Sequence, residues 1–116
     1  MKKLTAILCL TIAVLLRSYG ISESADYQKG LDAANSGDFA TALREWKPLA
    51  EQGHAVAQYN LGLMYRYGDG VSQNNKTATK WFRVAAEQGY ADAQYSLGLT
   101  YRYGEGVPRD DTTAVK

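Results

Sequence analysis

Few residues in the sequence could carry out catalysis or hold a metal ion. The 116 residues include one histidine, His54, and one cysteine, Cys9, which lies in an apolar N-terminal run. The sequence therefore offers too few residues for a histidine-based triad, a cysteine nucleophile, or a thiolate or multi-histidine metal site. His54 also has a structural interpretation, because Tyr90 holds the equivalent position 36 residues later. We predict no catalytic residue, no metal site and no cofactor.

Two pairs of carboxylates could in principle act as acid and base or bind a cation. Asp69 and Glu105 each lie between two glycines, at equivalent turns of the sequence. Asp110 and Asp111 stand where two asparagines stand 36 residues earlier, so helix capping accounts for them. The sequence thus predicts a protein that is not an enzyme. A hydrolase acting on cell-wall material is a less favoured alternative.

Tyrosine and arginine side chains form the pattern that most resembles a binding surface. Four residues spaced at i, i+4, i+7 and i+8 share one helix face: Tyr59, Leu63, Arg66 and Tyr67. The same pattern recurs 36 residues later as Tyr95, Leu99, Arg102 and Tyr103. Tyrosine and arginine are enriched among residues that dominate binding energy. We predict that a protein or peptide partner contacts Arg66, Tyr67, Arg102 and Tyr103, together with Tyr59 and Tyr95.

A structural interpretation of the same stripe stays open. A helix in a repeat array packs against its own partner and against the next unit, so Tyr59 and Leu63 could belong to the core between repeats. Arg66 could serve only to complement the partial negative charge at the end of its helix.

The sequence repeats itself with a period of 36 residues. Residues 57–71 read AQYNLGLMYRYGDGV and residues 93–107 read AQYSLGLTYRYGEGV, with twelve of fifteen positions identical. The same offset relates EQGHA at 51–55 to EQGYA at 87–91. A fixed period of this length is typical of solenoids and other repeat arrays.

Each repeat reads as a helical hairpin. Apolar residues at helical spacing predict a first helix over 55–67, ended by Gly68 in the left-handed conformation, with Gly70 allowing a second turn. The second helix is expected to begin near Asn75 as its N-cap and to stop at Gly89. Gly62 and Gly98 lie inside first helices, where each costs about 0.5 to 1 kcal/mol relative to alanine. We expect a bulky ring, Trp81, to fill the space beside Gly62.

The leading unit, residues 27–53, follows the same plan with a shorter connection. Asp38 is its expected N-cap. Pro48 falls inside the second helix of this unit, where a kink or a local 3₁₀ turn is expected.

Residues 1–24 do not belong to the repeat. Lys2 and Lys3 precede an apolar run at 4–16, and small residues follow, which is typical of a secretory signal peptide cleaved near 20–25. Cleavage would leave 10 basic and 11 acidic groups, a formal charge of −1. We therefore expect an exported protein, periplasmic or secreted, with no nucleic-acid partner and no membrane association beyond the export signal.

The two AQY…GV phrases, the group Ala78, Trp81 and Phe82, and the phrase AAEQGYADAQ resemble the Sel1-like repeat family. The resemblance covers residues 27–116, although the leading unit is closer to a tetratricopeptide repeat. It implies an all-α protein, an α/α solenoid forming a right-handed superhelix whose first helices line the concave surface. It also implies a role in binding or scaffolding. A cysteine-rich branch associated with penicillin binding has paired cysteines that these repeats lack.

The expected organisation is a hairpin at 25–54, a full repeat at 55–90 and an incomplete repeat at 91–116, since Lys116 corresponds to Lys80. The expected function is binding of a peptide or protein surface on the concave face, in the bacterial envelope or outside the cell. Self-association through the unfinished C-terminal edge is a further possibility. The alternative is a structural array that supports a C-terminal region and binds nothing itself.

Overall fold

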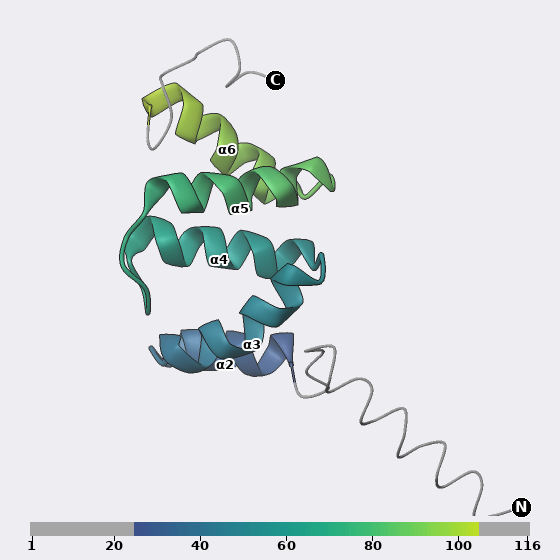
Figure 1. Cartoon of the computed structure of the whole chain (residues 1–116), viewed down its shortest axis with the longest axis vertical. Coiled ribbons are helices and arrows are strands. Elements are labelled where there is room, and N and C mark those ends of the chain that lie inside the picture. Colours follow the sequence, from purple (N-terminus) through teal and green to yellow (C-terminus); the bar gives the residue numbers. More distant parts are fainter. Residues whose placement is uncertain (1–24, 105–116) are drawn as a thin grey trace, which may run out of the picture.

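The computed structural model describes residues 25–104, which form five helices and no strand (Figure 1). The helices are α2 (Tyr27–Asn35), α3 (Phe39–Glu51), α4 (Ala55–Tyr67), α5 (Asn75–Glu87) and α6 (Ala91–Tyr103). Each helix packs chiefly against the one before it and the one after it in the chain. The predicted all-α repeat solenoid is thereby confirmed. The predicted signal peptide and the carboxylates Glu105, Asp110 and Asp111 lie outside the described residues.

Polar caps fix where the helices begin. Asp38 accepts a hydrogen bond from the backbone N–H of Thr41 at 3.1 Å, which confirms it as the N-cap of α3. The cap of α5 is Asn74, which accepts from Thr77 N–H at 3.1 Å, whereas the sequence analysis placed it at Asn75. That prediction was wrong by one residue because a cap needs an extended backbone, and Asn74 has it (φ −154°, ψ 99°) while Asn75 is already helical.

Two glycines shape the connection between α4 and α5. Gly68 ends α4 in the left-handed conformation (φ 73°), and its N–H donates to the carbonyl of Met64 at 2.8 Å, as predicted. Gly70 also has a positive φ of 71°, and a Cβ atom added there would lie 2.7 Å from Cβ of Phe39. The connection therefore lies against the first residue of α3, and a side chain at Gly70 would push it away.

Glycines inside the first helices let each hairpin close tightly. A Cβ atom at Gly62 would lie 2.6 Å from Cδ1 of Phe82, and one at Gly30 would lie 2.7 Å from Cδ1 of Trp46. The prediction of a bulky ring was correct, but the ring beside Gly62 belongs to Phe82 and not to Trp81. Adjacent helical residues point about 100° apart, and Phe82 is the one directed at α4. Trp81 is half-buried and packs at the edge of the core.

The ring-on-glycine contact is the same in both hairpins, although the number of residues between the glycine and the ring differs. Trp46 and Phe82 are 36 positions apart, whereas Gly30 and Gly62 are 32 positions apart. The difference equals the extra four residues in the connection between α4 and α5, which has seven residues against three between α2 and α3. The additional residues lengthen the turn and leave the ring-on-glycine contact unchanged.

Hydrogen bonds from glutamine side chains join successive units. Gln58 donates to the carbonyl of Ala50 at 3.0 Å, and Gln94, its equivalent, donates to the carbonyl of Ala86 at 3.2 Å. These carbonyls belong to the last turn of the preceding second helix, where each also accepts a hydrogen bond from the backbone N–H of a turn glycine, Gly53 or Gly89. Gln88 also donates to Oε1 of Gln58 at 2.7 Å. Each first helix is thus held to the end of the helix before it.

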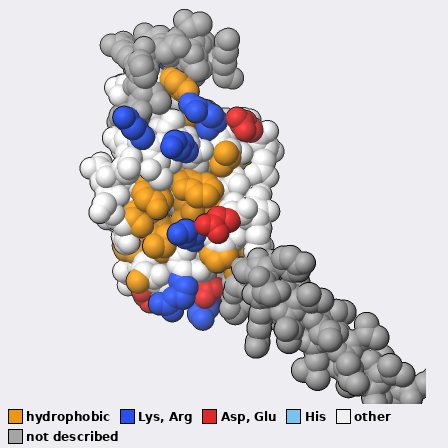
Figure 2. All heavy atoms as spheres, viewed as in Figure 1, with side chains coloured by type: hydrophobic (Ala, Val, Ile, Leu, Met, Phe, Trp, Pro, Cys, Tyr) orange, Lys and Arg blue, Asp and Glu red, His pale blue; other side chains and the backbone are white. Residues whose placement is uncertain are grey.

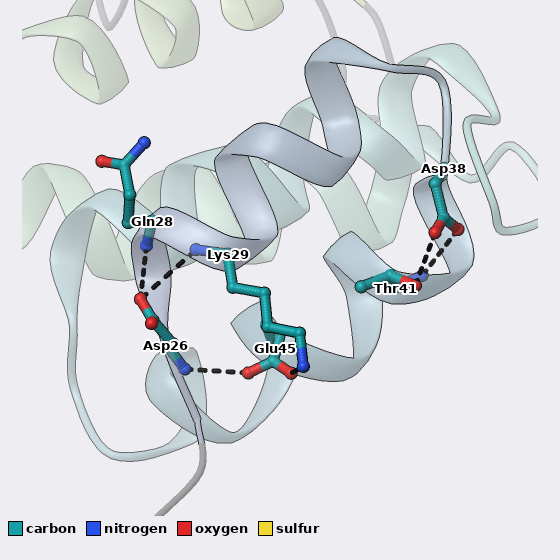
Figure 3. A network of polar contacts seen from close by, with 6 residues as sticks. All are labelled: Asp26, Gln28, Lys29, Asp38, Thr41 and Glu45. Atoms are coloured by element: carbon teal, nitrogen blue, oxygen red, sulfur yellow. Dashed lines mark hydrogen bonds and ion pairs between the residues drawn. The ribbon is translucent and has the colours of Figure 1, made fainter.

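A buried carboxylate ties the beginning of α2 to α3 (Figure 3). Glu45, only 6% exposed, accepts a hydrogen bond from the backbone N–H of Asp26 at 2.8 Å and lies 3.5 Å from Nζ of Lys29. Asp26 in turn caps α2 by accepting from the N–H groups of Gln28 and Lys29. Both carboxylate oxygens of Glu45 therefore have partners, which is what burial of a charge requires.

Pro48 does not interrupt α3, which is α-helical from Phe39 to Glu51. The expected 3₁₀ turn does not occur. A proline removes a single helical hydrogen bond, and Trp46 and Ala50 on either side are anchored in the core. A bend of the helix axis at Pro48 stays a prediction.

None of the helices within residues 25–104 combines the length and apolar character that crossing a membrane would require.

Replacing Gly62 by alanine is expected to lower the free energy of unfolding by up to about 2 kcal/mol. Overpacking against Phe82 costs about 1 to 3 kcal/mol, and the higher helix propensity of alanine returns only about 1 kcal/mol. Urea unfolding measures the difference. In a Phe82→Leu background the same change should cost clearly less, because the smaller side chain can give way. Equal costs in both backgrounds would mean that the ring is not what excludes a side chain at Gly62.

Acid is expected to cancel the contribution of Asp38 to stability. Its hydrogen bonds from the side chain and backbone of Thr41 hold the pKa of Asp38 below its usual value. A pKa lowered by folding contributes stability above the unfolded value, and that contribution is lost as pH falls through the folded pKa. The difference in unfolding free energy between the parent and Asp38→Ala should therefore be largest near pH 7 and shrink below about pH 4. A difference that does not change with pH would contradict this assignment.

Candidate functional site

The few residues that could support catalysis have structural positions. Nδ1 of His54 accepts a hydrogen bond from the backbone N–H of Ala57 at 3.1 Å, so His54 is the N-cap of α4. Its ring stacks on Tyr27 with centroids 5.4 Å apart. Asp69 lies in the turn after α4, where its backbone N–H donates to the carbonyl of Met64. Within residues 25–104 no group of three or more histidine, cysteine or acidic side chains could hold a metal ion.

Tyr59 lies in an aromatic cluster between helices. Its ring centroid is 5.7 Å from that of Phe82 on α5 and 5.3 Å from that of Tyr90, which precedes α6. Burial is the main reason, and the nearby charge of Asp92 the next, that the pKa of Tyr90 is raised. Tyr59 is half-buried, as is Leu63. These contacts are those of a residue that packs one unit against the next.

The first hairpin contains the same cluster. Tyr27 stacks on Trp46 with centroids 5.9 Å apart and on His54. Tyr27 is equivalent to Tyr59, 32 residues later, as first-helix residues are. Trp46 is equivalent to Phe82, and His54 to Tyr90, each 36 residues later. His54 and Tyr90 therefore occupy the same place in the two clusters. A planar ring is needed there, and either side chain supplies one.

Tyr95 holds the position of Tyr59 in the next unit but is 70% exposed. Its equivalents, Tyr27 and Tyr59, are covered by an aromatic ring from the second helix of their own hairpin. A tyrosine at this position is therefore a packing residue in the two hairpins whose second helices lie within residues 25–104.

The remaining candidates lie at the ends of the first helices, where Arg66 is half-buried and the other three are exposed. Tyr67 is 66% exposed at the end of α4, and Tyr103 is 65% exposed at the end of α6. The guanidinium carbon of Arg66 lies 5.9 Å from the ring centroid of Tyr67, within range of a cation–π contact. Arg102 occupies the equivalent place on α6 and is exposed.

The turn after α4 holds this end in place. Nε2 of Gln73 donates to the carbonyl of Arg66 at 2.9 Å. The left-handed caps Gly68 and Gly104 have nearly the same conformation (φ 73° and 70°), so both helices end in the same way. The structure thus presents an arginine and an exposed tyrosine at the same position of two successive first helices. Such side chains can bind a partner through charge-assisted hydrogen bonds and a rigid apolar contact.

One surface feature was not predicted from the sequence. A groove on α5 is lined by Thr77, Lys80, Trp81 and Val84. Their spacing of i, i+3, i+4 and i+7 could have marked them as one face of the helix. Trp81 was instead assigned to the space beside Gly62.

The sequence model of the Sel1 repeat family matches residues 55–90 and 91–116, more than half of the chain. A Sel1 repeat protein from Oxalobacter formigenes has a similar crystal structure, with a TM-score of 0.74, 32% identity and coverage of 78% of this chain. A protective antigen of uropathogenic Escherichia coli strains with an SLR fold also superposes with a TM-score of 0.74, at 39% identity over 84% of this chain.

An exopolysaccharide production negative regulator of Rhizobium meliloti (strain 1021) is 37% identical over 54 residues, 47% of this chain. The matches span only 20% of that regulator and 37% and 21% of the two crystallised proteins. The matched regions are the repeats, so these comparisons say nothing about the activities of the whole proteins. With two repeats matched by the family model and the same fold in both crystal structures, this chain belongs to the Sel1 repeat family.

Proposed function

We propose that this protein binds a protein partner through the surface formed by the ends of its first helices. Sel1 repeats typically mediate protein–protein interaction and are generally non-enzymatic scaffolds. The observation that supports this particular surface is the pair of exposed tyrosines, Tyr67 and Tyr103, each following an arginine at the same position of its unit. Isolated exposed aromatic side chains are common, but a repeated pair beside arginine has the composition of a binding hot spot.

The arginines and the tyrosines of this surface would make different kinds of contact with the partner. Arg66 and Arg102 would supply charge-assisted hydrogen bonds to carboxylates or backbone carbonyls of the partner. Tyr67 and Tyr103 would supply apolar area that loses little conformational freedom on binding. Tyr95 would extend the surface along α6. Tyr59 contributes mainly by fixing α4 against α5, because its ring already contacts Phe82 and Tyr90.

The proposal includes the cellular setting. The basic and apolar character of residues 1–24 supports export, so the partner would be a protein or peptide of the periplasm or of the extracellular space. Self-association through the edge formed by the last repeat is a second mode of binding within the same proposal. An array that only supports further sequence is the competing function, and it predicts no specific capture.

Simultaneous replacement Tyr67→Ala and Tyr103→Ala is expected to reduce capture of the partner at least about tenfold, since two hot-spot residues each contribute about 1 kcal/mol or more. The measurement is a quantitative pull-down from envelope extract with the full chain, followed by affinity measurement with the purified partner. Arg44→Ala with Lys47→Ala, two exposed residues of α3, is the control. Equal capture by the tyrosine variant and the parent would place binding elsewhere. Capture of nothing by either would favour the supporting array.

Stability should separate the packing tyrosine from the exposed one. Tyr59→Ala is expected to lower the free energy of unfolding by about 2 to 3 kcal/mol, because it removes a half-buried ring that contacts two other aromatic rings. Tyr67→Ala should change it by no more than about 0.5 kcal/mol. Urea unfolding followed by circular dichroism measures both. A large loss of stability in Tyr67→Ala would assign that residue to the core and remove it from the proposed surface.

A further inference from the structure

A groove of about 390 Å³ opens on the surface of α5. Among residues 25–104 its lining consists of four side chains of α5: Thr77, Lys80, Trp81 and Val84. Trp81 is half-buried and Val84 is 37% exposed, so the lining is largely apolar yet open to solvent. From residue 77 to residue 84 the helix rises by about 10 Å. The groove therefore has the length of about two helical turns.

The apolar side chains that line the groove do not recur on α3. The residue of α3 equivalent to Trp81 is Glu45, whose carboxylate is buried and bonded to the beginning of α2. The residue equivalent to Val84 is Pro48. The hairpin fold is the same in both units, so it does not by itself require an apolar groove on its second helix.

Positive charge borders the groove. Lys80 is part of the lining, Lys76 and Arg83 are exposed on the same helix, and Glu87 is the one carboxylate within α5. Figure 2 shows hydrophobic side chains gathered on the face that includes α4 and α5, with Lys and Arg side chains along the border nearer α6 and a neighbouring basic and acidic side chain at the opposite border. Arg83 also bonds to the hydroxyl of Tyr101 on α6, which leaves the lysines as the more available cations.

We propose that this groove binds an acidic amphipathic helix of a partner protein. Apolar side chains of that helix, spaced at i, i+3 or i+4 and i+7, would contact Trp81 and Val84 along the length of the groove. A carboxylate on the flank of the helix would pair with Lys80, and complementary charge would favour this partner over a basic one. The surface shares no residue with the tyrosine and arginine surface, so either can fail without the other.

Tryptophan fluorescence tests the proposal directly, because the chain has only two tryptophans. In a Trp46→Phe variant of the full chain, Trp81 is the sole reporter. Phenylalanine is a fitting replacement, since Phe82 holds the place of Trp46 in the second hairpin. The probe is a synthetic helical peptide of about 14 residues with a leucine face and glutamate flanks, free of tryptophan and tyrosine. A matched peptide carries lysine in place of each glutamate.

The acidic peptide should change the emission of Trp81 saturably, and the basic peptide should bind at least about tenfold more weakly. Lys80→Glu and Val84→Glu should each weaken binding of the acidic peptide at least about fivefold. Lys76→Glu makes the same charge change outside the lining and should have a clearly smaller effect. Should Trp46→Phe fail to fold, the two indole N–H signals in the nuclear magnetic resonance spectrum of the parent replace the fluorescence readout.

Four results would overturn the proposal. No response at about 1 mM acidic peptide would mean that the groove has no useful affinity for it. Equal binding of the basic peptide would remove the assignment of an acidic partner. Equal effects of Lys76→Glu and Lys80→Glu would reduce the interaction to general charge attraction. A change of Trp81 emission with protein concentration alone would assign the groove to a second copy of the chain.

Discussion

The contact of an aromatic ring with a helical glycine is the constraint on which both complete hairpins depend. Trp46 lies over Gly30 and Phe82 lies over Gly62, each where an ordinary side chain would stand. The helices can approach closely because one of them has no Cβ atom at the crossing. Dense packing of this kind is the main source of stability for helices that would be marginal alone. The longer turn of the second unit changes the chain length between glycine and ring and leaves their contact intact.

Two further contacts convert separate hairpins into an array. A tyrosine of α2 and of α4, Tyr27 and Tyr59, touches both the ring over the glycine and the ring that precedes the next first helix. A glutamine side chain then bonds to a carbonyl at the end of the preceding second helix, as Gln58 does with Ala50. Each contact satisfies groups that belong to two units, so neighbouring units stabilise one another as expected for a repeat array.

Because the ring-on-glycine contact uses equivalent positions in both complete hairpins, we expect function to reside in the side chains that packing leaves exposed. Tyr67 and Tyr103 are periodic yet exposed, which suits a partner that follows the array along successive repeats. The groove at Trp81 is not periodic, since Glu45 holds its place in the first hairpin, and it suits a partner that recognises one unit. A shared fold specifies neither partner, and the surface residues must do so.

The sequence by itself determined the local features of this protein, because they depend on residues close together in the chain. The period of 36, the bounds of α4, the cap at Asp38 and the left-handed turn at Gly68 could all be predicted in this way. Only the tertiary structure decided which ring covers Gly62, that Glu45 is buried, that Tyr59 packs between two units, and that α5 has a groove. Helical spacing tells which residues share a face, but the rotation of one helix against another decides which face is covered, and that rotation is set by side chains distant in sequence.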